Sequence, residues 1–302
     1  MGLLMQSGNL KVQLERAVAS SQQRIRHRPL DWQARWLRAM ALEWIARTLH
    51  LVVPTTARTF WGEQMRVLVP EGISSHLLHA GYFEEGLTRV LLDLLRPGMT
   101  FFDVGAHYGY FTLLASHIVG PSGRVHAFEP APATFATLEH NTRRKQNVTR
   151  QNVALYSRAA KLEFMDYGLV MSAFSSIYPE RLLPRDRKGA VPRLREVTAV
   201  TLDDYIERYG ARPDLIKIDA EGSESEILRG AERVLAEGRP MITMEVADVG
   251  VWSPVPCRDL VSFLIQRGYK AFECQGETVR PHELRETYEY DNLLFVPEEK
   301  HL

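Results

Sequence analysis

Short apolar runs alternate with helix-patterned stretches between residues 100 and 297. In the stretch after residue 110, Phe111, Leu114 and Ile118 recur at the spacing of one helix face. Apolar strands that alternate with helices indicate an α/β fold, a parallel sheet covered by helices on both faces. We expect the strands at 100–105, 124–129, 148–155, 214–220, 241–246, 269–274 and 292–297.

A second helix is predicted after residue 223, where apolar positions repeat up to Leu235. Ser223 and Glu226 have the spacing of a capping box at its start. The alternation breaks between Ala159 and Val200, where 161–167 and 172–178 resemble a hairpin and 181–195 a polar loop. We interpret this region as an insertion, a kind of segment that often carries specificity.

Residues 1–60 follow another pattern, with nine Lys or Arg against three Asp or Glu. Trp32, Trp36, Ala39, Met40 and Glu43 fall at helical spacing, which gives one largely apolar face beside arginines. We expect a helical extension, residues 1–60, that docks on the main domain, 61–302, or forms a homo-oligomer contact. Attachment to a membrane surface or an anionic ligand is the alternative.

The segment 60–72 between these regions is expected to form a strand pair, or a strand and a turn. A helix should follow it from about Tyr82 to Leu95, because Pro97 and Gly98 stop a helix there.

Composition excludes several classes of protein. The 302 residues include 37 basic and 37 acidic side chains, so no overall field favours nucleic acid. The two cysteines form neither a metal-ligand spacing nor a disulfide framework, which favours the cytoplasm. No secretory signal is expected at the N-terminus, and the apolar stretch 40–54 contains Glu43 and Arg47 and is too short to span a bilayer.

A turn with small residues follows the first strand. The strand ends at Val104, and Gly105, Ala106 and Gly109 precede the next helix. Such residues let the backbone approach the helix and a ligand closely, at the strand ends where parallel sheets bind ligands. Glu129 ends the next strand, twenty residues after Gly109, and fits an acid that accepts hydrogen bonds from a ribose. A nucleoside ligand is therefore predicted, although a simple surface acid is the alternative for Glu129.

The turn differs from the dinucleotide-binding pattern G-x-G-x-x-G. Asp103 precedes the first glycine and would repel a pyrophosphate, whereas it suits a ligand with an ammonium and a sulfonium. These features favour S-adenosylmethionine. The alternative for Asp103 is an acid that accepts hydrogen bonds from the amides of its own turn. The alternatives for the function are an NAD-dependent oxidoreductase and a non-catalytic nucleoside-binding scaffold.

The chain resembles the FkbM-type S-adenosylmethionine-dependent methyltransferases over about residues 60–297. The motifs that carry the resemblance are FFDVGAHYGYFTLLAS, VHAFEPAPATFATLEHN, TLDDYI, PDLIKIDAEGSESEILRGAERVL, PMITMEV and YDNLLFVP. The resemblance implies a class I, Rossmann-like fold with a seven-stranded, mostly parallel sheet and a reversed last strand. It also implies methyl transfer to an oxygen of a sugar, a macrocycle or another natural product.

The same resemblance assigns contacts to the cofactor. By position, Asp103, Gly105, Ala106, Gly109 and Tyr110 would hold its methionine part, Glu129 the ribose, and Ala154 and Leu155 the adenine. We further expect Glu84 to close over the cofactor. The predicted contacts also include His107, Tyr108, Pro130 and Asp219.

Transfer to a hydroxyl requires a group that takes its proton. Asp219, Glu221 and Glu245 lie at the carboxyl ends of two strands. They are candidates for a general base, for anchors of the acceptor, or for ligands of a divalent ion that the sequence alone does not establish. Lys217 lies on the same side of its strand as Asp219, so a buried ion pair is the alternative for that acid. His107 is a second candidate base, or simply a cover for the cofactor.

Overall fold

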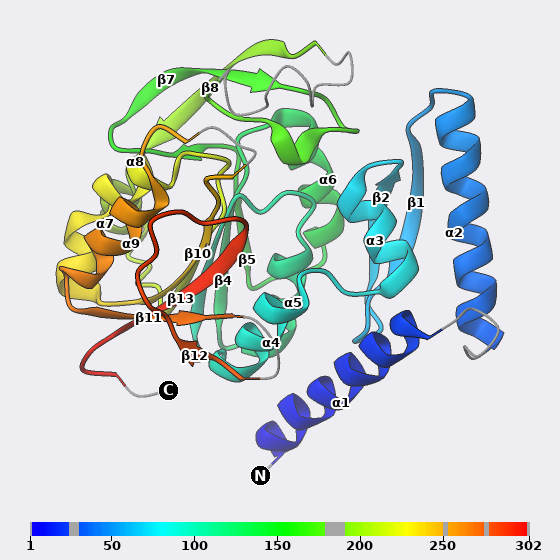
Figure 1. The fold of residues 1–302 in the computed structure, drawn as a ribbon, viewed down its shortest axis with the longest axis horizontal. Helices are drawn as coiled ribbons and strands as arrows, with labels where there is room; N and C mark the ends of the chain where they lie inside the picture. Colours follow the sequence, from blue (N-terminus) through cyan, green and yellow to red (C-terminus); the bar gives the residue numbers. More distant parts are fainter. Residues whose placement is uncertain (1, 24–29, 179–190, 250–252, 275–277, 301–302) are drawn as a thin grey trace.

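The computed structural model describes residues 2–23, 30–178, 191–249, 253–274 and 278–300 (Figure 1). Its centre is an eight-stranded sheet with the order β12-β11-β13-β10-β9-β3-β4-β5. The strands are β3 (Thr100–Val104), β4 (Arg124–Phe128), β5 (Val148–Gln151), β9 (Leu215–Ile218), β10 (Met241–Val246), β11 (Tyr269–Glu273), β12 (Arg280–Pro281) and β13 (Asp291–Pro297).

The predicted fold class is confirmed. Strands β5, β4, β3, β9 and β10 pair in parallel, and β13 runs antiparallel to both β10 and β11, so the last strand is reversed. One detail differs, because the two-residue β12 adds an eighth strand beside β11. A strand of two residues is too short to give a repeating pattern in the sequence.

Helices cover the sheet on both faces. Successive residues of a strand point to opposite faces, so neighbouring residues of β3 contact different sets of helices. Phe101 belongs to the apolar core shared with α4 (Glu85–Leu94) and α5 (Tyr110–Val119). Its neighbour Phe102 belongs to the core shared with α7 (Leu202–Tyr209), α8 (Glu224–Arg229) and α9 (Cys257–Ile265). Helix α6 (Pro132–Thr142) packs Leu138 against Ala127 of β4.

The N-terminal region contains α1 (Gly2–Gln22), α2 (Leu30–Thr48), β1 (Val53–Arg58), β2 (Gln64–Val69) and α3 (Gly72–Ala80). The expectation of a helical segment up to residue 60 is wrong at its end, because 53–58 pair with β2 as an antiparallel ribbon. The strand in 60–72 is present as β2, and its partner lies upstream. The helix expected from Tyr82 begins at Glu85, after the separate helix α3.

The insertion forms a second sheet from β6 (Ala154–Leu155), β7 (Ala160–Asp166) and β8 (Arg193–Val200), in the order β6-β8-β7. Two predictions are therefore wrong. The segment 148–155 divides into β5 and β6, which lie in different sheets, and the hairpin partner of β7 is β8 rather than 172–178. That second segment forms a short 3-10 turn, Ser172–Phe174, and a single bridge from Ser176 to Met165. Residues 181–190 of the predicted polar loop 181–195 lie outside the described residues, and its last three residues, 193–195, belong to β8 instead.

The predicted capping box is also wrong. Ser223 precedes α8 but makes no capping hydrogen bond with its side chain. Glu226 instead receives hydrogen bonds from Ser157 and Arg229. Glu224 Oε1 accepts a hydrogen bond from the Ala220 N–H at 2.9 Å and so tightens the loop before the helix. Among the described helices, none is both long and apolar enough to cross a membrane.

Candidate active site

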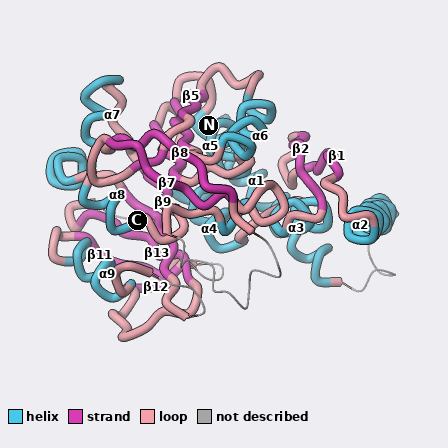
Figure 2. The backbone as a smooth tube through the Cα atoms, turned by 90° about the horizontal axis from the view of Figure 1, so that it is seen from above, coloured by secondary structure: helices cyan, strands magenta, loops and turns pink. Residues whose placement is uncertain are grey.

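A cavity lies at the carboxyl ends of β3, β4 and β9, under the insertion. Figure 2 looks onto this side of the molecule, with β7 and β8 crossing above the end of the main sheet. The predicted residues that line the cavity are Gly105, His107, Glu129, Pro130, Ala154, Leu155, Asp219 and Glu221. The insertion adds Phe164, Ser172, Ala173, Ser175 and Ile177. The cavity therefore brings together residues from both halves of the sheet and the insertion.

Glu129 is fixed at the end of β4 by two backbone donors. Its Oε2 accepts from the N–H of His107 at 3.0 Å, and its Oε1 accepts from the N–H of Ala131 at 2.9 Å. Burial raises the pKa of this carboxyl to about 7, although both hydrogen bonds oppose the shift. The carboxylate is thus oriented before any ligand binds, and each of its oxygens has a further lone pair.

The turn after β3 requires its glycines for packing within the protein. Gly105 has a φ of +73°, and a Cβ there would lie 1.7 Å from the Asp219 carbonyl oxygen. Gly109 has a φ of +92°, and a Cβ there would lie 2.7 Å from Leu138 Cδ1. The backbone of this turn therefore does pack closely, against the loop after β9 at Gly105 and against helix α6 at Gly109.

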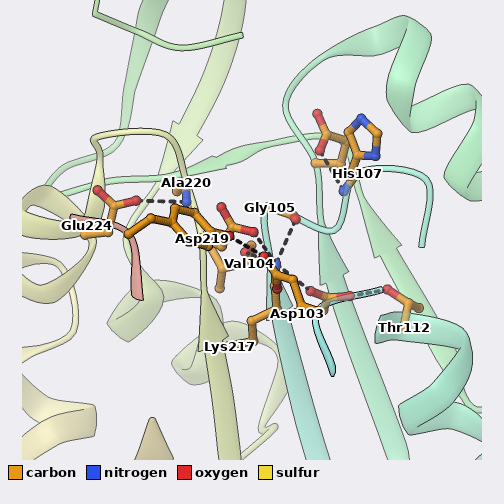
Figure 3. Close-up of polar contacts among 12 residues, drawn as sticks. Asp103, Val104, Gly105, His107, Thr112, Lys217, Asp219, Ala220 and Glu224 are labelled. Carbon is orange, nitrogen blue, oxygen red and sulfur yellow. Dashed lines mark hydrogen bonds and ion pairs between the residues drawn. The ribbon is translucent and has the colours of Figure 1, made fainter. Parts of the chain in front are cut away.

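Asp103 lies beneath this turn and is fully buried. Figure 3 shows its carboxylate directed at Thr112, whose hydroxyl donates to Oδ2 at 2.5 Å. The Lys217 ammonium lies 3.5 Å from Oδ1. Asp103 is absent from the cavity lining formed by the described residues, so a direct contact with a bound cofactor stays a prediction.

Lys217 links Asp103 to Asp219. Its ammonium is 3.2 Å from Asp219 Oδ2 and donates to the Gly105 carbonyl oxygen at 3.1 Å. Burial alone would lower the pKa of Lys217, but the carboxylates of Asp219, Asp103 and Glu84 raise it above its ordinary value. The lysine therefore stays charged, and the ion pair considered from the sequence is present.

Asp219, Glu221 and Glu245 converge beside the cavity, whose described lining includes the first two but not Glu245. Their carboxylate oxygens include one from each residue within 4.8 Å of one another. Burial would raise the pKa of Asp219, but the Lys217 ammonium and a hydrogen bond with Glu245 lower it. Burial, and then repulsion from Asp219 and Glu221, raise the pKa of Glu245 well above its ordinary value. Asp219 is therefore more acidic, and Glu245 less acidic, than an ordinary carboxyl.

His107 covers one side of the cavity. Its ring Nε2 lies 2.7 Å from Ser172 Oγ, and its ring stacks on Tyr108 with 3.9 Å between centroids. Burial lowers the pKa of His107 to about 3, with Asp219 partly opposing the shift. The imidazole is therefore neutral at neutral pH, and its Nε2 is engaged by Ser172, which favours the covering role.

The other predicted residues lie behind these groups. Ala106 packs against Ala127 and Leu138, and the Tyr108 hydroxyl donates to the Leu169 carbonyl at 2.9 Å. The Tyr110 hydroxyl lies 3.2 Å from Thr88 Oγ1. Their contacts support the walls of the site, and a contact of any of them with the cofactor stays a prediction.

Glu84 lies beside the acidic groups, at the start of α4. It receives a hydrogen bond from the Tyr290 hydroxyl, and burial, followed by repulsion from Asp219, raises the pKa of its carboxyl to about 7. Glu84, His107 and Glu221 all have positive φ values, of 39°, 50° and 50°. Non-glycine residues in this conformation concentrate at functional sites.

Sequence reasoning did not identify Ser172 or Ser175 as part of the site. Ser176, next to them, donates to the Glu221 carbonyl oxygen at 2.6 Å and so joins the insertion to the acidic loop. The serine-rich run 172–176 is the signal in the sequence that points to them, but its alternating pattern favours a strand.

The chain is similar to known methyltransferases in sequence. The Methyltransferase FkbM domain matches residues 103–271. The chain is 32% identical over 177 residues to the 31-O-demethyl-FK506 methyltransferase FkbM of Streptomyces tacrolimicus, covering 51% of this chain and 68% of the relative. It is 25% identical over 154 residues to the hexuronic acid methyltransferase AglP of Haloferax volcanii, covering 50% and 58%.

A solved structure, the methyltransferase FkbM of Methylobacillus flagellatus KT, aligns with a TM-score of 0.43 and 17% identity. The alignment covers 74% of this chain and 54% of that one, so the chain spans about half the length of that structure. Helices α1 and α2 lie outside the region that the domain family matches.

Proposed function

The chain belongs to the FkbM family of methyltransferases, and from this premise we propose that it transfers the methyl group of S-adenosylmethionine to a hydroxyl of a small-molecule acceptor. One observation carries the proposal. A single cavity is lined by the oriented carboxyl of Glu129 and the apolar Leu155 on one side and by the acids Asp219 and Glu221 on the other. The first side suits a nucleoside, and the second suits a cation and an acceptor hydroxyl.

Glu129 would receive the two ribose hydroxyls, because each of its oxygens is held by only one backbone N–H. The adenine would lie against Ala154 and Leu155, at the start of the insertion sheet. The methionine part would then extend toward Gly105 and Asp219, where the acidic groups favour its ammonium and sulfonium.

In the reaction, the acceptor oxygen attacks the methyl carbon in line with the carbon–sulfur bond. That bond breaks, its electron pair goes to sulfur, and the acceptor loses its hydroxyl proton. Asp219 lines the cavity and stays ionised beside Lys217, so it can accept a hydrogen bond from the acceptor hydroxyl and then its proton, as the oxygen becomes acidic on forming the bond to the methyl carbon. The rigid strands β9 and β10 hold the acids in place and so help to orient the acceptor.

A divalent ion is the alternative to direct proton transfer. Three carboxylates with oxygens within 4.8 Å of one another are the donor set that hard cations such as Mg²⁺ prefer. An ion there would favour the ionised form of Glu245, whose pKa is otherwise raised, and would lower the pKa of the acceptor hydroxyl. The Lys217 ammonium already offsets part of the repulsion among these carboxylates, so a divalent ion is not required to hold them together.

The relatives' names support an oxygen acceptor, since one acts on 31-O-demethyl-FK506 and another on hexuronic acid. Incubation with labelled S-adenosylmethionine and pooled hydroxylated metabolites, including sugars and macrocycles, tests the proposal. Label should pass to an oxygen of one acceptor class. A protein that binds the cofactor tightly but labels no acceptor in such pools would favour a non-catalytic nucleoside-binding role.

A further inference from the structure

The outer face of α2 is unusually apolar. Eight of the eighteen exposed large hydrophobic side chains of the described residues lie between residues 30 and 52. Five of them, Leu30, Leu37, Met40, Trp44 and Ile45, project from one side of α2, and we name them the α2 stripe. Trp44 is 69% exposed and Leu37 is 59% exposed, so neither is covered by the rest of the chain.

The stripe cannot turn inward, because the opposite face of α2 is fixed. Ala39 and Ala46 are buried there. Arg35 donates to the carbonyl oxygens of Leu78 at 2.7 Å and Leu77 at 2.8 Å. Glu43 pairs with His79 at 2.9 Å. Helix α2 is thus anchored to α3 in one rotational position.

Both views place α2 at the edge of the molecule. In Figure 1 the helix lies at the far right, with β1, β2 and α3 between it and the main sheet. Figure 2 shows it nearly end-on at the same edge, with no described element on its outer side. The stripe therefore forms part of the outer surface.

Positive charge flanks the stripe. Residues at the helical spacing 30, 34, 37, 41, 44 and 48 are all uncharged, whereas Arg38 and Arg47 are exposed on either side of them. Residues 1–60 hold nine of the chain's 37 basic side chains but only three of its 37 acidic ones. An apolar face that contains tryptophan and leucine between arginines is typical of helices that lie in a membrane interface.

We infer that the α2 stripe docks on the surface of an anionic lipid bilayer, with the helix lying in the plane of the headgroups. Trp44 and Leu37 would enter the boundary between headgroups and acyl chains. Arg38 and Arg47 would lie at the level of the lipid phosphates. This role goes beyond methyl transfer and does not depend on it.

A second copy of the chain is a poorer occupant. A 19-residue helix is about 28 Å long and about 10 Å wide, which gives roughly 300 Å² in projection against about 800 Å² that each partner buries in a stable dimer. Paired stripes would also bring Arg38 and Arg47 of two copies close together. Glu43 cannot compensate these charges, because it is paired with His79 on the inner face.

Flotation of the full chain with vesicles tests the inference. We expect the protein to float with vesicles of phosphatidylcholine and phosphatidylglycerol at low salt, and to float poorly with phosphatidylcholine alone or at high salt. Leu37→Glu and Trp44→Glu should abolish flotation. Arg47→Gln should weaken it about fivefold, the effect of one basic residue near such a surface.

Leu284→Glu is the matched control, because Leu284 is also exposed, at 41%, but lies far along the chain from α2. It should float like the unaltered protein. S-adenosylhomocysteine binding and the melting temperature should be unchanged in all variants, which shows that they fold.

Three results would overturn the inference. They are an absence of flotation with anionic vesicles at low salt, flotation that survives both Leu37→Glu and Trp44→Glu, and a dimer in light scattering that either substitution converts to a monomer. The last result would assign the stripe to a second copy of the chain.

Discussion

The ammonium of Lys217, on β9, lies 3.2 Å from Oδ2 of Asp219, which lines the cavity from the loop after that strand. The same ammonium is 3.5 Å from Asp103, so one buried lysine holds two carboxylates. This arrangement explains why Asp219 is ionised among other acids.

Replacing the lysine should cost much stability. Lys217→Met leaves two buried carboxylates without a cation, and breaking a buried pair typically costs about 3–5 kcal/mol of unfolding free energy. Denaturant unfolding measures the loss. Lys161→Met removes an exposed pair with Glu196 at 3.4 Å and should cost less than about 1 kcal/mol. Equal losses in the two variants would show that the Lys217 pairs contribute little.

Asp219→Asn should lower turnover by about a hundredfold or more while S-adenosylhomocysteine binding persists, because the amide cannot take the acceptor's proton. Single-turnover rates and titration calorimetry separate the two effects. Glu237→Gln, an exposed acid after α8, is the control and should leave both unchanged. Full activity of Asp219→Asn would remove this residue from the mechanism and direct attention to His107.

The pKa of Glu245 predicts how a metal would bind. Because the pKa of Glu245 is raised, a proton competes with a cation for this carboxylate up to a higher pH than for an ordinary glutamate. Magnesium affinity should therefore rise with pH, and Glu245→Gln should weaken binding and flatten this dependence. Magnesium titration calorimetry at several pH values measures both. Full activity after exhaustive treatment with EDTA would exclude a required ion and leave direct proton transfer to Asp219.

Gly105→Ala should destabilise the fold itself, because the new Cβ would lie 1.7 Å from the Asp219 carbonyl oxygen. The strands β3 and β9 would have to separate, and we expect a loss above about 4 kcal/mol, as for other severe steric clashes. Gly168→Ala is the control, since Gly168 has the same φ of +73° but nothing within 4 Å of an added Cβ. It should cost only about 1–2 kcal/mol.

The sequence predicted those features that depend on local patterns. Strands 100–104, 124–128 and 241–246 are short, mainly apolar runs, and the helix-patterned stretches between such runs indicate an α/β fold. The sequence also predicts that Glu129 and Asp219 lie at one edge of the sheet, because the carboxyl ends of parallel strands share an edge, and both line the same cavity.

The remaining features depend on pairing between distant segments. The partner of β7 is β8, which lies beyond the poorly patterned residues 167–192, so spacing could not identify it. Lys217 lies opposite Asp103 on the neighbouring strand. This pairing could not be predicted from the sequence, because it requires knowing that β3 and β9 are neighbours in the sheet. The close contact of Gly105 with the Asp219 carbonyl could not be predicted for the same reason, because the two residues are 114 positions apart in the sequence.

Titration calorimetry of S-adenosylhomocysteine against the unaltered protein and Glu129→Gln tests the central claim, that the cavity binds the cofactor through Glu129. The raised pKa of about 7 means that Glu129 gains its charge as the pH rises through neutrality. Binding to the unaltered protein should therefore strengthen from about pH 6 to about pH 8, as the acceptor of the ribose hydroxyls becomes ionised. Glu129→Gln should bind about 2–3 kcal/mol more weakly at the upper pH and lose most of the pH dependence. An unchanged dissociation constant in the folded variant across this range would contradict the account.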